Sequence, residues 1–114
     1  YKEMLKVGGE NVSPAAIEEE LCSLVPSIEQ VAAVGLPDQR LGEVPVAYVV
    51  PKPGMTCTLE DVEARCKGKI ASFKIPRHVV TLDSLPMTAS GKVQRVLLRE
   101  RAARELVPED LQNH

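Results

Sequence analysis

Two apolar runs rich in β-branched residues, at positions 31–36 and 44–50, constrain the fold of this chain most strongly. Each run is rich in valine and is bounded by residues typical of turns, which is the pattern of a β-strand. The connection between them, residues 37–43, is mostly polar and is expected to be exposed. The sequence therefore predicts two strands, and the remaining elements must pack on them.

A helix is predicted to begin directly after Ser13. Serine at the N-cap followed by Pro14 at the first helical position is a strong start signal. Residues 18–20 are all glutamate and lie early in the helix, where the helix dipole favours acids, so we expect a solvated acidic surface there. Pro26 is predicted to end the helix.

The later elements complete an α+β pattern. Thr58 is predicted to cap a second helix reaching residue 70, and Thr58 with Asp61 forms a weak capping box. Residues 78–82 predict a third main strand and residues 96–106 a last helix. The sequence thus predicts a small three-stranded sheet with helices packed on it, plus a short two-stranded element at the N-terminus.

Composition excludes several functional classes for this chain of 114 residues. The net charge of -2 argues against a nucleic-acid partner bound mainly through phosphates, and no apolar run is long enough to span a membrane. Cys22, Cys57 and Cys66 show no metal-binding spacing, and we expect three buried, reduced thiols and hence a cytoplasmic location.

The sequence offers no complete catalytic constellation. It contains no plausible Ser-His-Asp set, metal-ligand cluster or paired-carboxylate site, so we expect this chain to bind no metal and to be inactive by itself. His78 precedes an apolar run and is predicted to be structural.

Lys92 is the most distinctive candidate residue. It follows the small residues 88–91 in a loop between a strand pattern and a helix pattern. A lysine on such a loop is either an ordinary solvated charge or a movable cation that enters a neighbouring site. An ammonium of the second kind suits a site where a carboxylate and a phosphate meet.

Two further segments allow both a structural and a functional reading. Gly8-Gly9 is either a strand turn or a place where a ligand runs close to the backbone. Phe73, Lys74 and Arg77 either cover a sheet edge or form an aromatic and basic surface suited to a nucleotide.

Two strings of the sequence resemble one family. They are KEMLKVGGENVSPAAIE at residues 2–18 and PMTASGK at residues 86–92. Together they resemble the small C-terminal domain of the adenylate-forming superfamily, which includes acyl-CoA synthetases, peptide-synthetase adenylation domains and beetle luciferases. The similarity continues in VGLPD, LGE and FKIPR, and it covers about the first 105 residues in order.

The resemblance implies a domain organisation. Residues 1–107 are expected to form the C-terminal lid domain and residues 108–114 a flexible tail. The family places a Gly-Arg dipeptide before the residue matching Tyr1, so we expect the chain to start inside a motif. The large N-terminal domain, which binds most of the ATP and the acyl substrate, is expected to be absent and to be the lid's main partner.

The resemblance also implies an activity in two steps. A fatty or aryl acid attacks the α-phosphate of Mg·ATP to give an acyl-adenylate, and the thiol of CoA then displaces AMP. The lid rotates between the steps. Two alternatives stay open: a peptide-synthetase lid that serves a carrier protein, and a binding module without catalysis.

Five residues receive family roles from their matched positions. Lys92 matches the catalytic lysine of the first step, and Lys2 matches the hinge residue. Gly8 and Gly9 match the loop that lines the pantetheine tunnel after rotation, and Lys6 matches a second lysine that enters the rotated active site in some relatives.

The CoA nucleotide site is implied less directly. Phe73, Lys74 and Arg77 lie where aryl-CoA ligases place aromatic and basic residues. This sequence departs from that pattern because Ile75 stands where some relatives are basic and Arg40 stands where a stacking aromatic can occur. We therefore expect adenine to be held differently, with Arg40 as a further contact.

Overall fold

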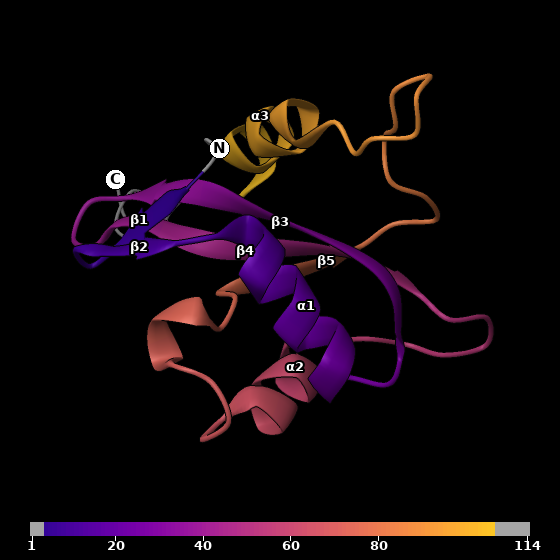
Figure 1. The fold of residues 1–114 in the computed structure, drawn as a ribbon, viewed down its shortest axis with the longest axis horizontal. Helices are drawn as coiled ribbons and strands as arrows, with labels where there is room; N and C mark the ends of the chain where they lie inside the picture. The colour runs from indigo at the N-terminus through magenta and orange to yellow at the C-terminus, as the bar shows by residue number, and fades with distance from the viewer. Residues whose placement is uncertain (1–3, 107–114) are drawn as a thin grey trace.

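The computed structural model describes residues 4–106 (Figure 1). The element order alternates strands with helices. The strands are β1 (Leu5–Val7), β2 (Glu10–Val12), β3 (Ile28–Asp38), β4 (Gly42–Pro51) and β5 (His78–Thr81). The helices are α1 (Pro14–Leu24), α2 (Leu59–Cys66) and α3 (Arg95–Glu105), with a single 3-10 turn η1 (Ser72–Lys74) between α2 and β5. Nearly every predicted element is therefore present.

Strand β4 organises the sheet. It pairs antiparallel with β3 along almost its whole length, parallel with β5, and antiparallel with β1 at Val7 and Gly42. β2 pairs with β1, so the order is β2-β1-β4-β3, with β5 also beside β4. The prediction of a three-stranded sheet and a two-stranded N-terminal element is confirmed, and the contact between β1 and β4 joins the two parts into one sheet.

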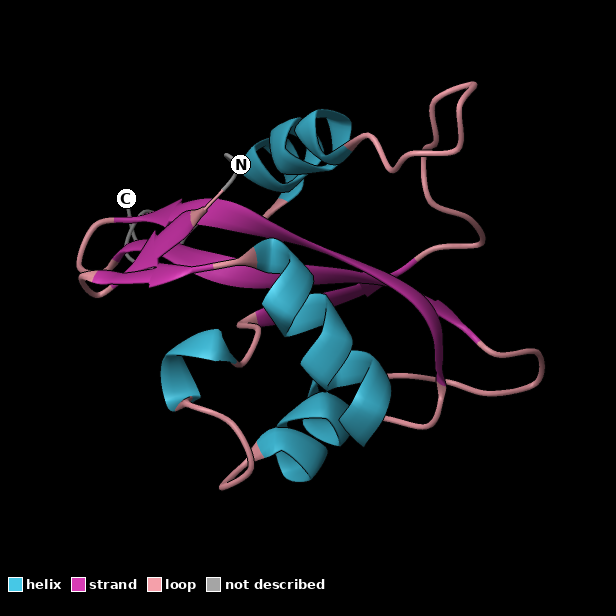
Figure 2. Ribbon diagram, in the orientation of Figure 1, coloured by secondary structure: helices cyan, strands magenta, loops and turns pink. Residues whose placement is uncertain are grey.

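Helices cover both faces of this sheet. Figure 2 shows α1 and α2 against one face and α3 against the other. Alternate residues of β3 and β4 face opposite ways. Ala33 and Val49 join the core beneath α1 and α2, whereas Val34, Val46 and Tyr48 join the core beneath α3. Burial on both faces explains why the two strands are continuous apolar runs.

The predicted helix starts are confirmed by their hydrogen bonds. The Ser13 hydroxyl accepts from the Ala16 amide at 3.3 Å, with Pro14 at the first helical position. Thr58 and Asp61 form both bonds of a capping box, each 3.1 Å long. Helix α2 ends at Cys66 rather than at residue 70, because the backbone turns extended and then takes a positive φ at Gly68.

One prediction about the cysteines is wrong. Cys57 and Cys66 are buried free thiols, and burial raises the pKa of each. Cys22 is exposed. The buried stripe of α1 runs through Ile17 and Leu21, and the next residue along a helix is rotated by about 100° from that stripe. Cys22 follows the buried Leu21 in sequence, but its side chain lies on a different face of the helix and is exposed.

The described part of the chain has neither a membrane-spanning helix nor a cluster of metal ligands. None of the helices within residues 4–106 has the length and apolar character needed to cross a membrane. Over the same residues, no three His, Cys, Asp or Glu side chains gather in a way that could hold a metal ion.

Candidate functional site

Lys92 lies on a loop that projects from the body of the domain. Figure 1 shows this segment, drawn in orange between β5 and α3, extending beyond the sheet. Met87 and Val93 form an antiparallel bridge at the base of the loop. The Thr88 amide donates to the Lys92 carbonyl at 2.7 Å, and the Gly91 amide donates to the Thr88 carbonyl at 3.0 Å. The loop is thus a small hairpin with a defined turn.

The Thr88 side chain holds the tip of this hairpin. Its hydroxyl accepts from the Lys92 amide at 3.1 Å and lies 3.1 Å from the Ser90 hydroxyl. Gly91 has a φ of 89°, which lets the chain reverse just before Lys92. Lys92 itself is exposed. The arrangement presents an ammonium outward, which suits a site on another domain.

A groove of about 540 Å³ lies on a different part of the surface. Its lining includes four residues that the family resemblance singled out: Gly8, Arg40, Phe73 and Arg77. They come from the β1–β2 turn, the β3–β4 connection, η1 and the residue before β5. Three residues predicted for the CoA nucleotide and one predicted for the pantetheine tunnel, from segments far apart in sequence, therefore lie around one groove.

Two of the six residues predicted to contact CoA, Lys74 and Gly9, lie outside this lining. Lys74 forms an ion pair with Glu20 of α1, at 3.7 Å between Nζ and Oε1. Gly9 has a φ of 90°, and a Cβ added there would meet nothing within 4 Å. The positive φ values of Gly8 and Gly9 are what a tight hairpin turn requires, so the turn accounts for both glycines without a ligand.

The groove is lined by two arginines and one glutamate, Glu10, so positive charge exceeds negative charge there. Arg40 and Arg77 are both exposed there. The amides of Leu41 and Arg40 both donate to Asp38 Oδ1 at 2.9 Å. The Leu41 bond is the main cause that lowers the Asp38 pKa, and the Arg40 amide and the charges of Arg77 and Arg40 act in the same direction. The ionised Asp38 shapes the β3–β4 turn that carries Arg40.

His78 fits the structural role predicted for it. It is the first residue of β5 and is only partly exposed. Burial lowers its pKa first, and the neighbouring positive charge of Arg77 lowers it further.

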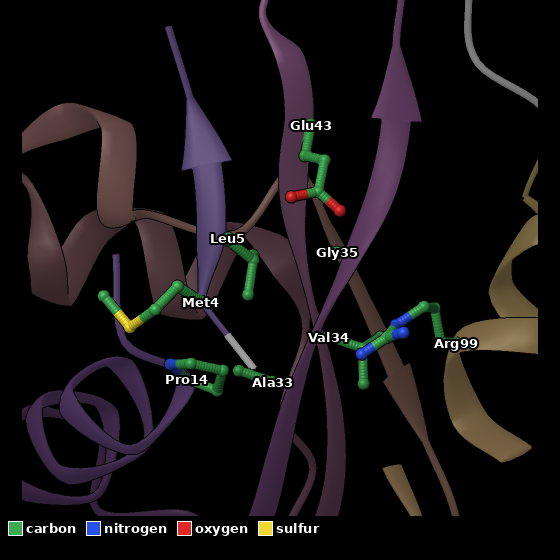
Figure 3. Close-up of a pocket in the computed structure, with 8 residues that line it drawn as sticks. All are labelled: Met4, Leu5, Pro14, Ala33, Val34, Gly35, Glu43 and Arg99. Carbon is green, nitrogen blue, oxygen red and sulfur yellow. The ribbon is translucent and has the colours of Figure 1, made fainter. Parts of the chain in front are cut away.

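Lys6 is exposed on β1, and its backbone is held from β4. Its amide donates to Glu43 Oε1 at 2.9 Å. Figure 3 shows Glu43 beside Gly35 in a second cavity, of about 230 Å³, with Arg99 reaching toward Val34 from α3. The predicted hinge, Lys2, lies outside the described residues.

The structure separates the two sets of candidate residues. In Figure 1 the β1–β2 turn lies at the left of the sheet, whereas the orange loop lies at the upper right, well separated from it. Lys92 is therefore not part of the groove that contains Gly8, Arg40, Phe73 and Arg77. One domain thus carries two separate candidate surfaces.

The prediction that the glutamates of α1 are merely solvated is wrong for Glu18. Its carboxylate accepts the Ala33 amide at 2.8 Å and pairs with Arg95 at 2.6 Å. These partners lie 15 and 77 residues away, so no local pattern could identify them.

Comparisons with known proteins identify the family of this domain. Residues 16–92 match the model of the AMP-binding enzyme C-terminal domain. The 7a-methyl-1,5-dioxo-octahydroindenyl-propanoyl:CoA ligase of Rhodococcus jostii is 50% identical over 99 residues, covering 87% of this chain and 19% of that protein. A mitochondrial medium-chain acyl-CoA ligase of Danio rerio is 42% identical over 105 residues, covering 92% of this chain and 17% of that protein.

Solved structures show the same fold. The apo crystal structure of MatB from Rhodopseudomonas palustris superposes with a TM-score of 0.83 at 36% identity, covering 90% of this chain and 20% of MatB. The ATP-bound form of that protein matches with a TM-score of 0.82 at 35% identity, with the same coverage of both chains. This chain spans less than a fifth of the length of the two ligases above. The chain belongs to the family of AMP-binding enzyme C-terminal domains.

Proposed function

We propose that residues 1–107 are the lid domain of an acid–thiol ligase that activates a carboxylic acid with ATP and transfers the acyl group to CoA. Residues 108–114 would form its tail. The observation that carries the proposal is an exposed lysine, on a hydrogen-bonded hairpin, in a domain that is 42–50% identical to CoA ligases. In this proposal the active site is shared with a large N-terminal domain, so the lid alone is inactive.

Lys92 would act in the first step. The carboxylate of the acid attacks the α-phosphate of Mg·ATP, the bond to pyrophosphate breaks, and an acyl-adenylate forms. Negative charge from the carboxylate and the phosphate accumulates in one place during this attack. A preorganised cation such as the Lys92 ammonium stabilises that charge by roughly 3 kcal/mol.

The groove at the other end of the sheet would act in the second step. Here the CoA thiol attacks the acyl carbonyl and AMP leaves. Arg40 and Arg77 would hold CoA phosphates, Phe73 would contact the adenine, and pantetheine would pass close to the backbone of Gly8.

Three lysines keep secondary roles in this proposal. Lys2 would be the hinge and Lys6 would enter the rotated site. Lys74 would contribute less to CoA binding than Arg77, because it is paired with Glu20 and lies outside the groove lining. We also propose a cytoplasmic enzyme, which agrees with three unpaired cysteines.

Replacing Lys92 in the full-length ligase tests the first step. We expect Lys92→Ala to lower ATP–pyrophosphate exchange by about 100- to 1,000-fold, the cost of losing one preorganised group, and to spare thioester formation from supplied acyl-adenylate. Lys52→Ala, which removes an exposed lysine between β4 and α2, is the matched control and should change neither. Equal loss in both half-reactions would contradict the role of Lys92.

Replacing Arg77 tests the second step and distinguishes CoA from a carrier-protein acceptor. We expect Arg77→Ala to raise the KM for CoA by about 10-fold, equivalent to losing roughly 1.4 kcal/mol of binding, and to leave pyrophosphate exchange unchanged. With pantetheine, which lacks the nucleotide, the variant should match the wild type. The control is Arg65→Ala in the last turn of α2, outside the groove lining. An unchanged KM for CoA would favour a carrier-protein acceptor.

A further inference from the structure

One ion pair connects helices that lie on opposite faces of the sheet. Glu18 belongs to α1 and Arg95 is the first residue of α3. Arg95 Nη2 lies 2.6 Å from Glu18 Oε1 and 2.8 Å from Oε2, and Arg95 Nε lies 3.2 Å from Oε2. The guanidinium therefore holds both carboxylate oxygens, which is the strongest geometry for such a pair. The Glu18 and Arg95 side chains are only 16% and 31% exposed.

The ion pair between Glu18 and Arg95 lies beside the edge strand of the sheet, β3. Strand β3 is the last strand in the sheet order, so one side of it has no neighbouring strand among the described residues. The Ala33 amide of β3 donates to Glu18 Oε2 at 2.8 Å. The Glu18 carboxylate thus connects its own helix, α1, to the edge strand β3 and to α3.

The first turn of α3 is not stabilised by a side-chain N-cap. Its N-cap, Gln94, makes no side-chain capping bond, whereas Ser13 and Thr58 cap α1 and α2. An arginine in the first turn is also opposed by the helix dipole, which favours acids there. Pairing with Glu18 accounts for a basic residue at this position.

The base of the Lys92 hairpin is attached to the same point. The Gln94 amide donates to the Pro86 carbonyl at 2.9 Å, which closes the hairpin directly before Arg95. Arg95 follows Lys92 by three residues. A contact that holds Arg95 in place therefore also holds the base of the hairpin that carries Lys92.

We propose that Glu18 and Arg95 are positioning residues for Lys92, an inference that rests on the proposed ligase function. They hold the start of α3 against the sheet edge, and so set the reach and direction of the catalytic ammonium. The mechanism is geometric: a displacement of about 1 Å at a reacting group can cost on the order of 100-fold in rate. The groove at the other end of the sheet does not depend on this pair, so the second half-reaction should not depend on it either.

The test uses two conservative variants of the full-length ligase. Arg95→Lys keeps the charge but loses the two-pronged geometry, and Glu18→Gln keeps the shape and an acceptor for the Ala33 amide but loses the charge. We expect each to lower kcat for pyrophosphate exchange by about 10- to 100-fold, with the KM for ATP and thioester formation from supplied acyl-adenylate both within about 2-fold of wild type. The double variant should lose no more than the worse single variant, because the residues act as one unit.

A second ion pair on the same helix provides the control. Arg101 and Glu105 lie 2.9 Å apart and are more exposed. Glu105→Gln should leave both half-reactions unchanged. Unfolding temperatures of all variants separate positioning from folding, since a structural role alone would lower both half-reactions together with stability.

The outcomes are distinguishable. Equal losses in both half-reactions, or no loss in either, would overturn the positioning role while leaving the ligase function intact, provided that Lys92→Ala still lowers exchange by about 100- to 1,000-fold. Retention of exchange by Lys92→Ala would instead overturn the proposed function and, with it, this inference.

Discussion

Gly35 shows how one residue adapts the sheet to its neighbours. It is a buried residue of β3, and a Cβ built there would lie 2.6 Å from Glu43 Oε2 and 3.2 Å from Leu5 Cγ. The Glu43 carboxylate occupies that space while it accepts the Lys6 amide. The missing side chain therefore permits a bond between β1 and β4 that adds to their pairing at Val7 and Gly42.

Gly35→Ala is expected to destabilise the chain by about 1–3 kcal/mol, the usual cost of overpacking. Urea unfolding measures this free energy. Because the clash is with Glu43, combining Gly35→Ala with Glu43→Ala should cost less than the sum of the two single changes. Additive costs would show that the glycine is needed for another reason.

Asp38 predicts a pH dependence at the residue scale. Its pKa is lowered in the fold, mainly by the Leu41 amide. A carboxyl with a lowered pKa contributes stability that is present above its unfolded pKa of about 3.9 and is lost as pH falls through the lower folded value. Asp38→Asn should therefore reduce stability near neutral pH and flatten its decline below about pH 4. Unfolding free energies between pH 2 and 7 test this, and equal slopes for variant and wild type would refute it.

At the scale of the element, sequence signals between neighbouring residues predict the helices and strands correctly. The N-caps, the strand positions and the final helix follow from residues close together in sequence, so they could be predicted. Strand β3 begins at Ile28 and ends at Asp38, well beyond the predicted 31–36, because pairing with β4 carries the ladder into less apolar residues. Tertiary contacts of this kind have no local signature.

Pro45 illustrates a feature that the pattern could not explain. It lies inside β4, although proline cannot donate to a sheet ladder. Its carbonyl accepts the Arg77 amide at 2.9 Å, and β5 begins to pair with β4 only at Val46. The missing N–H thus falls where the neighbouring strand has not yet begun.

The capping box of α2 supplies the prediction at this scale. Thr58→Ala removes the hydroxyl that accepts the Asp61 amide and should cost about 1 kcal/mol of unfolding free energy. Thr56→Ala, at an exposed position two residues earlier and outside the helix, is the matched control and should cost little. Similar losses for both would show that the cap is not the cause.

At the scale of the whole molecule, the sheet separates two surfaces and keeps them in a fixed relation. The resemblance named Lys92, Gly8, Arg40, Phe73 and Arg77, but sequence alone could not show which of them meet. The structure brings the last four together and places the lysine hairpin at the opposite end. Long-range pairs such as Glu18 with Arg95 were beyond prediction, because their partners are set by helix packing on two faces.

The carboxylate of Glu18 has one more consequence, for association between molecules. The outer side of an edge strand exposes backbone groups that another chain can pair with, which is how sheets aggregate. At Ala33 that donor is already occupied, and a second strand would have to displace a charged group held by an arginine. Glu18, which holds the start of α3, therefore also disfavours the pairing of another strand with β3 at Ala33. It lowers the tendency of the domain to aggregate through this edge.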